Sequence, residues 1–162
     1  MDMLSSLRVV QGLQHVADAF SGTTLSDVIK MTAHGRIMFI VQRGVGATGT
    51  AVLTVQGCDN AAGDNPVAVP FRYRTVDLSD SDIPTALTVA TAAGFTFAAG
   101  TGDLALVEVE DEVLSADGVT LTVDKGWVQL KSVEGVDSPV LGGIIAILGD
   151  PLFSEPTTTV IA

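Results

Sequence analysis

Apolar residues recur at every second position along much of the chain, in short runs that glycine, proline or aspartate residues separate. The alternation is clear in Thr50–Gln56, Leu104–Glu110, Val119–Val123 and Trp127–Val133. Successive side chains of an extended strand point to opposite faces, so a period of two predicts a strand with one buried face. Seven or eight such segments with turn signals between them predict an all-β fold, mainly an antiparallel β-sandwich or a barrel-like domain.

Two further segments are apolar without alternation, Ile37–Val41 and Val140–Leu148. Such runs are typical of strands buried on both faces, and the β-branched content of the second favours a central strand over a helix. The loop Gly44–Gly49 follows the first run and precedes the alternating strand Thr50–Gln56. We therefore expect Phe39–Gln56 to form a hairpin around this glycine-rich connection.

One or two short helices are expected beside the strands. Apolar residues near the N-terminus have helical spacing, which Gly12 interrupts, so this stretch is either a short helix or an extended arm. Asp82 is suited to cap a second helix that Gly94 would end, although an irregular loop with extended pieces is the alternative for this segment. Val67–Arg74 is expected to be one strand, in which Pro70 marks an edge or a bulge.

The domain organisation follows from these patterns. We expect an N-terminal arm over residues 1–24, a β-rich domain over residues 25–154 and a C-terminal tail over residues 155–162. The tail is rich in β-branched residues and lacks a turn signal, so it would either pair with a neighbouring subunit or fray.

Charge and composition exclude several classes of protein. The chain of 162 residues has 8 Lys and Arg against 19 Asp and Glu, a net charge of −11, yet 47% of its residues are hydrophobic. So negative a chain does not suit nucleic acid or an anionic membrane surface, and so apolar a chain is not disordered. The single Cys58 allows no disulfide within the chain, and Val140–Leu148 is too short to span a membrane.

Residues that could carry out chemistry are few. Neither His15 nor His34 has partners at metal-ligand spacing, and the Gly44–Gly49 loop lacks the lysine of a phosphate-binding loop. Acidic residues gather at 59–64, 77–82 and 103–112, where the alternatives are a structural cation and, in preference, a solvated acidic face. The sequence therefore predicts no catalytic, metal or cofactor-binding residue, no cofactor, and no enzyme activity.

Several phrases, in order over most of the chain, resemble those of small structural proteins of tailed bacteriophages. They are Val16–Phe20, Phe39–Thr50, Cys58–Asn60, Val69–Arg74, Val128–Lys131, Asp137–Gly143 and Ala146–Pro151. The phrases concern packing and turns and include no active-site signature. The size is similar to that of capsid decoration, or cement, proteins.

This resemblance implies a non-enzymatic protein on the outer surface of a virion capsid, made in the host cytoplasm. Its partners would be the major capsid protein and further copies of itself, with a trimer favoured, and neither nucleic acid nor membrane. A tail-tube or tail-terminator subunit, for which the expected hairpin would be needed, and a host-glycan-binding module are the alternatives. The residues expected to contact partners are Leu4, Leu7, Val10, Leu13, Arg72, Arg74, Thr158, Val160 and Ile161.

Overall fold

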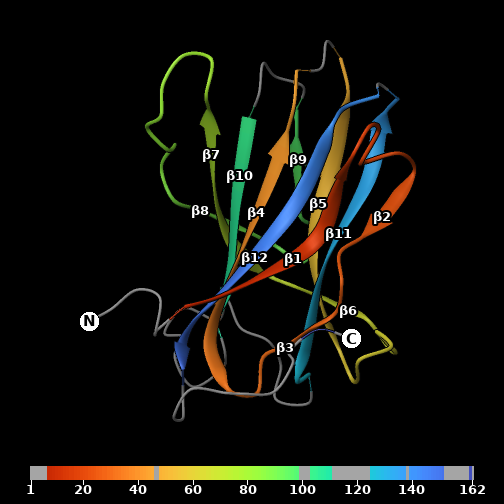
Figure 1. Cartoon of the computed structure of the whole chain (residues 1–162), viewed down its shortest axis with the longest axis vertical. Helices are drawn as coiled ribbons and strands as arrows, with labels where there is room; N and C mark the ends of the chain where they lie inside the picture. Colours follow the sequence, from red (N-terminus) through yellow and green to blue (C-terminus); the bar gives the residue numbers. More distant parts are fainter. Residues whose placement is uncertain are drawn as a thin grey trace.

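A computed structural model describes residues 7–45, 48–98, 103–110, 125–137, 139–151 and 161. These residues form twelve β-strands in two antiparallel sheets (Figure 1). The strands are β1 (Arg8–Val16), β2 (Thr23–Leu25), β3 (Ile29–Lys30), β4 (His34–Arg43), β5 (Thr50–Cys58), β6 (Val67–Val69), β7 (Phe71–Asp77), β8 (Thr88–Ala90), β9 (Phe95–Phe97), β10 (Asp103–Glu110), β11 (Trp127–Val136) and β12 (Gly142–Pro151). The expected all-β sandwich is confirmed.

The first sheet, here called sheet A, has the strand order β1-β12-β4-β10-β7-β8. Its centre is formed by β12, β4 and β10, in which Ala146 lies opposite Phe39 and Phe39 lies opposite Val107. The prediction that the apolar run Val140–Leu148 contains a central strand is confirmed, because β12 pairs on both sides.

The second sheet, here called sheet B, has the order β2-β11-β5-β6, with β3 also pairing to β11 and β9 to β5. Its long strands β5 and β11 run antiparallel over almost their whole length, and Leu53 lies opposite Ser132. Both strands were predicted from their alternating residues. The strand predicted at 119–123, between β10 and β11, falls outside the described residues.

The core lies between the two sheets and consists of every second side chain of the long strands. Phe39 of sheet A and Leu53 of sheet B are both fully buried. Complete burial of such a side chain contributes roughly 1.5–3 kcal/mol to folding. The buried cluster comprises Ala19, Phe20, Ile29, Met31, Ile37, Phe39, Val41, Leu53, Val55, Val69, Phe71, Ala90, Phe97, Ala105, Val107, Val109, Val128, Leu130, Ile144, Ala146 and Leu148.

The expectation of short helices is wrong for the described residues, which contain none. The N-terminal stretch is strand β1, at the edge of sheet A, and a bulge at Gly12 places both Val10 and Leu13 against the core. This irregularity is why apolar residues three apart imitated helical spacing. The segment between Asp82 and Gly94 is a loop that leads into the short strand β8, as the alternative interpretation had it.

Two connections also differ from expectation because the chain changes sheet. Strand β4 belongs to sheet A and β5 to sheet B, so Phe39–Gln56 is not a hairpin and the glycine-rich loop crosses from one layer to the other. The same happens at Pro70, where β6 of sheet B ends and β7 of sheet A begins. A proline suits this position because it has no N–H to donate to a ladder.

Candidate functional site

The outward face of sheet A is apolar over most of its width, and we call it the apolar face. Met38 and Ile40 of β4 point outward and are only half-buried, because their neighbours in sequence point into the core. The prediction that the run Ile37–Val41 is buried on both faces is therefore wrong, because only its inward face is buried. The apolar face comprises Leu7, Val9, Met38, Ile40, Leu87, Val89, Leu104, Leu106, Ile145 and Ile147.

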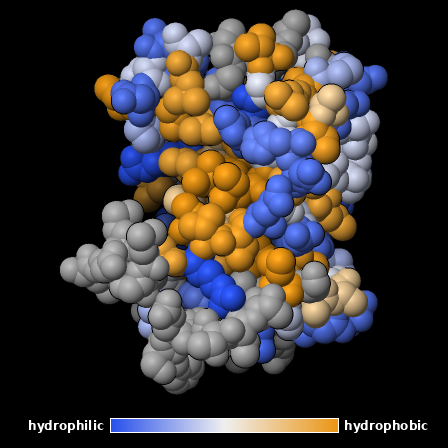
Figure 2. All heavy atoms as spheres, viewed as in Figure 1, coloured by the Kyte–Doolittle hydropathy of each residue, from blue (hydrophilic) through white to orange (hydrophobic). Residues whose placement is uncertain are grey.

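Strand register places these side chains in adjacent rows. Val9 of β1, Ile147 of β12 and Met38 of β4 are direct neighbours across three strands. Two residues further along β4, Ile40 lies between Ile145 of β12 and Leu106 of β10. Figure 2 looks onto this face and shows one broad hydrophobic area across the middle of the molecule.

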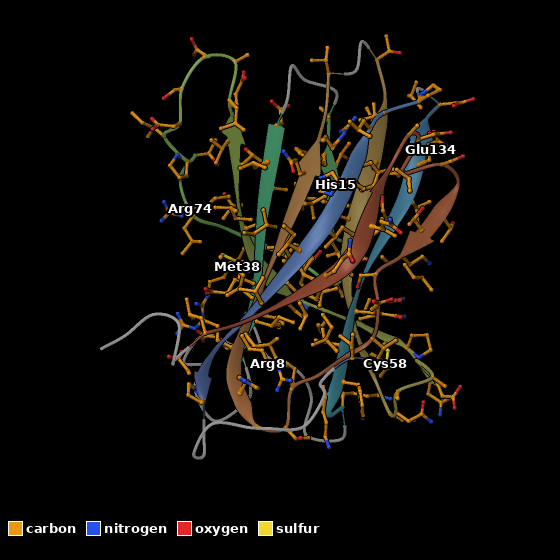
Figure 3. The ribbon with its side chains drawn as sticks, in the orientation of Figure 1. Arg8, His15, Met38, Cys58, Arg74 and Glu134 are labelled. Carbon is orange, nitrogen blue, oxygen red and sulfur yellow. The ribbon has the colours of Figure 1, made fainter. Side chains whose placement is uncertain are left out.

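Two shallow hollows interrupt the apolar face. One, of about 160 Å³, lies on the β7 side between Met38, Leu106 and Leu87. The other, of about 240 Å³, lies on the β1 side and is lined by Val9, Leu13 and Ile145 together with polar neighbours. Figure 3 shows Met38 between Arg74 at the β7 side and His15 at the β1 side. The face therefore offers recesses into which side chains of another molecule can insert.

A network of ion pairs borders the apolar face where β4, β10 and β7 run side by side. Arg72 donates to Glu110 at 2.7 Å and to Glu108 at 3.2 Å. Arg36 contacts Glu110 at 2.8 Å and Asp150 at 3.3 Å. The side chain of Glu110 is only 5% exposed, and two guanidinium groups compensate its charge.

This network bears on the acidic clusters seen in the sequence. Glu108 and Glu110 point to the same face, but their oxygens contact arginines. Among the described residues no group of three or more His, Cys, Asp or Glu side chains is placed to hold a metal ion. Residues 111 and 112 fall outside the described residues.

The two histidines have different environments. His15 is exposed on the outer side of sheet A, where its Nε2 contacts Oε1 of Gln42 at 2.9 Å. His34 is buried at the start of β4. Burial lowers the pKa of His34 below its usual 6.5, and the positive charge of Arg8 lowers it further.

A separate cleft of about 270 Å³ opens between the sheets on the side of β7 and β9. The rings of Tyr73 and Phe95 stack there, with their centroids 3.8 Å apart. Burial, and then the charge of Asp77, raise the pKa of Asp103 at its base. Beside it, Arg43 donates to the carbonyl oxygens of Phe97, Ala98 and Gly49 and so ties the connections of the two sheets together.

The residues expected to contact partners are distributed over several places. Leu7 lies on the apolar face and Arg72 and Arg74 lie beside it. Val10 and Leu13 pack against the core and also line the hollow on the β1 side. Arg72 meets carboxylates of its own chain, and Arg74 donates to the carbonyl of Thr85. Ile161 forms an isolated bridge with Ile29. Leu4, Thr158 and Val160 fall outside the described residues.

Sequence reasoning did not identify most of the apolar face. Its central members Met38, Ile40, Ile145 and Ile147 belong to the two continuous apolar runs. An apolar run means that both sides of a strand are apolar, and burial within the same chain is only one way to cover the second side. The signal was therefore present, but it was interpreted as a completely buried strand.

Comparisons with known proteins add little to this description. No protein-family model matches the chain, and no curated protein does. A chain in the structure of infectious bursal disease virus, strain Gx, is similar to it with a TM-score of 0.25 and 12% identity. That similarity covers 90% of this chain but only 42% of the viral chain, so this chain spans less than half its length. No helix among the described residues is long and apolar enough to cross a membrane.

Proposed function

We propose that this protein is a non-enzymatic structural subunit of a tailed-phage virion that binds and stabilises the capsid exterior, as a decoration protein does. The observation that carries the proposal is the apolar face. Outward apolar side chains lie in adjacent rows on several strands, and a contiguous exposed area of this kind is typical of a surface that another protein covers. The resemblance of the sequence to virion structural proteins supplies the setting.

Two further properties support a structural role. The long strands of the two sheets pack against each other through an apolar core, and such close-packed interiors are hard to compress. The net charge of −11 suits the outside of a capsid, away from packaged DNA. The proposed partners are the major capsid protein and other copies of this chain, with three copies favoured, and neither nucleic acid nor membrane.

The tail-tube or tail-terminator alternative loses the support of its expected hairpin, because β4 and β5 pair in different sheets. Electron microscopy of virions labelled at the C-terminus distinguishes the alternatives. Label over the head surface supports the proposal, and label confined to the tail or to fibres contradicts it.

The direct test of the proposal is a heating experiment on phage heads. Purified protein is added to expanded heads that lack it, and the temperature at which the heads rupture is measured. We expect saturating protein to raise that temperature and an unrelated acidic β-sandwich protein to leave it unchanged. An unchanged rupture temperature with bound protein, or no binding at all, would contradict the proposal.

A further inference from the structure

The apolar face is large enough to form a stable protein interface. Its residues lie on β1, β12, β4, β10 and β8 or directly beside them, and β7 contributes the outward side chains of Arg72 and Arg74. With a strand spacing of about 4.8 Å and a length of roughly 30 Å per strand, the outer side of five such strands, apolar and charged residues together, covers about 700 Å². A standard interface buries about 800 Å² on each partner, so the apolar face with its charged rim is comparable in size to one side of a specific interface.

The charges on and around this face are balanced, unlike those of the chain as a whole. The face and its rim hold Arg36, Arg72 and Arg74 against Glu108, Glu110 and Asp150. The other described residues carry 5 Lys and Arg against 10 Asp and Glu, a net charge of −5. The net charge of the described residues therefore lies outside the face and its rim.

This distribution identifies the partner that the face suits. Two copies of a chain with charge −11 repel each other wherever their acidic surfaces meet. Over the apolar face this repulsion is smallest, and burial of apolar area is favourable there. A basic partner, in contrast, would be steered toward the acidic surfaces rather than to a neutral face.

We propose that the apolar face is the contact between copies of this chain, so that the protein is a homo-oligomer held together through the outer side of sheet A. Outward side chains such as Ile145 and Ile147 of one copy insert into the hollows of the next. The inference assigns a surface to the oligomer proposed above, but it does not rest on capsid binding, since association of the purified chain is measured without heads.

The test compares matched lysine substitutions on the outer sides of the two sheets. Ile145→Lys and Val9→Lys place a charge within the apolar face, at side chains 37% and 64% exposed in the single chain. Leu25→Lys, at a side chain 46% exposed on the edge strand β2 of sheet B, is the control. Circular dichroism melts establish that each variant folds. If Ile145→Lys does not fold, Val9→Lys at the edge of the sheet is used as the test variant instead.

Sedimentation equilibrium then gives the mass of each variant at micromolar concentration. We expect the wild type and Leu25→Lys to be oligomers of the 16.6 kDa chain. Burial of an unpaired ammonium is costly, so Ile145→Lys and Val9→Lys should associate at least about 100-fold more weakly. A mass of two chains means that the face packs on itself, and a mass of three means that it packs on another surface of the next copy.

Three results would overturn the inference: a monomeric wild type, folded face variants with wild-type mass, or dissociation by Leu25→Lys alone. The rupture assay on heads separates this failure from failure of the proposed function. A monomeric wild type that still protects heads, but loses protection with Ile145→Lys, would assign the face to the capsid protein. An oligomer that Ile145→Lys dissociates, but that never protects heads, would leave the inference standing without the capsid role.

Discussion

The outer side of sheet A and the outer side of sheet B are built from similar strands but present different chemistry. The outward residues on the long strands of sheet B include Val52, Thr54, Gln56, Gln129, Lys131 and Val133, with Trp127 at the start of β11. Most of these have polar ends, whereas the corresponding positions in the centre of sheet A are Met38, Ile40, Leu106, Ile145 and Ile147. Because the inward sides of both sheets are mostly apolar, the core is formed without the outward residues.

This difference shows which requirements each face meets. The polar side chains of sheet B satisfy one another or water, so this surface is complete in a single chain. The outward apolar side chains of sheet A make no hydrogen bonds to water, and removing their surface from water by contact with another molecule is favourable. An antiparallel sheet normally has one solvated face, and sheet A departs from this pattern.

The polar contacts on the two outer faces differ in the same way. On sheet A, Arg72 and Arg36 hold the nearly buried Glu110. On sheet B the corresponding central contact is between neutral groups, since the side-chain nitrogen of Gln129 donates to the oxygen of Gln56 at 3.0 Å. Charged groups shielded by neighbouring apolar residues depend on one another more strongly than neutral groups do.

The largest expected effect comes from removing one partner of each contact. Arg72→Met leaves the buried carboxylate of Glu110 with Arg36 alone and should lower the free energy of unfolding by about 3 kcal/mol. Gln129→Met removes a neutral donor and should cost about 1 kcal/mol. Urea denaturation at one protein concentration measures both.

The matched pair also provides its own control, because both substitutions introduce methionine at an outward position. Equal losses from Arg72→Met and Gln129→Met would mean that the ion pairs on sheet A are ordinary surface contacts. In that case the two outer faces would differ in hydrophobicity but not in how they hold polar groups.

How far the sequence predicts this molecule depends on which interactions are local. The alternation of Leu53 and Leu130 with polar neighbours identified β5 and β11, because the period of a strand is written into its own residues. Pro70 was visible as an irregularity in the strand expected at Val67–Arg74, although not as the point where the chain changes sheet. The two-layered all-β architecture follows from these features.

What the sequence did not reveal depends on distant contacts. The crossing of Gly44–Gly49 between the sheets is decided by β4 pairing with β10 and β12, strands that come much later in the chain. The bulge at Gly12 likewise exists only against β12. The apolar face was not predicted for a related reason. Both sides of the run Ile37–Val41 are apolar, so its residues alone do not indicate which side lies in the core.

Two adjacent glycines test whether the outer side of sheet A is as open as the inner side is packed. A Cβ at Gly142 would lie 2.5 Å from the ring of Phe20 and 2.7 Å from the backbone oxygen of Gln42, both held in place by their surroundings. A Cβ at Gly143 would approach the ring of His15 as closely, at 2.5 Å, but His15 is exposed and can turn away.

Gly142→Ala should therefore cost about 2 kcal/mol through overpacking, whereas Gly143→Ala should cost less than about 0.5 kcal/mol. Thermal melts monitored by circular dichroism are sufficient to rank the two variants. If Gly143→Ala destabilises as much as Gly142→Ala, then the outer side around His15 is packed as rigidly as the core, and the contrast between the two sides of sheet A fails at this end.

The smallest expected effect is a difference in how the two sheets respond to acid. In sheet A, burial and then Arg8 lower the pKa of His34, whose Nδ1 has no hydrogen-bond partner within the described structure. The unfolded chain therefore takes up this proton more readily than the folded chain, and stability falls as the pH drops from neutral through 6.5. His34→Asn should flatten the stability profile in this interval.

At the end of sheet B, the hydrogen bond from Lys125, followed by that from Asn65, lowers the pKa of Asp59. A lowered carboxyl pKa stabilises the fold above the usual 3.8, and this contribution disappears as the pH falls below it. Asp59→Asn should therefore be slightly less stable than the wild type near neutral pH and equal to it in strong acid, with no change of slope around 6.5.

Denaturant midpoints measured over the pH range separate the two sites, because the histidine changes its protonation in an interval where the aspartate does not. If His34→Asn keeps the wild-type slope of stability against pH below neutral pH, then water reaches His34 more easily than its burial indicates. The inner side of sheet A would then be less closed to solvent at this end, and its contrast with the outer side would be smaller.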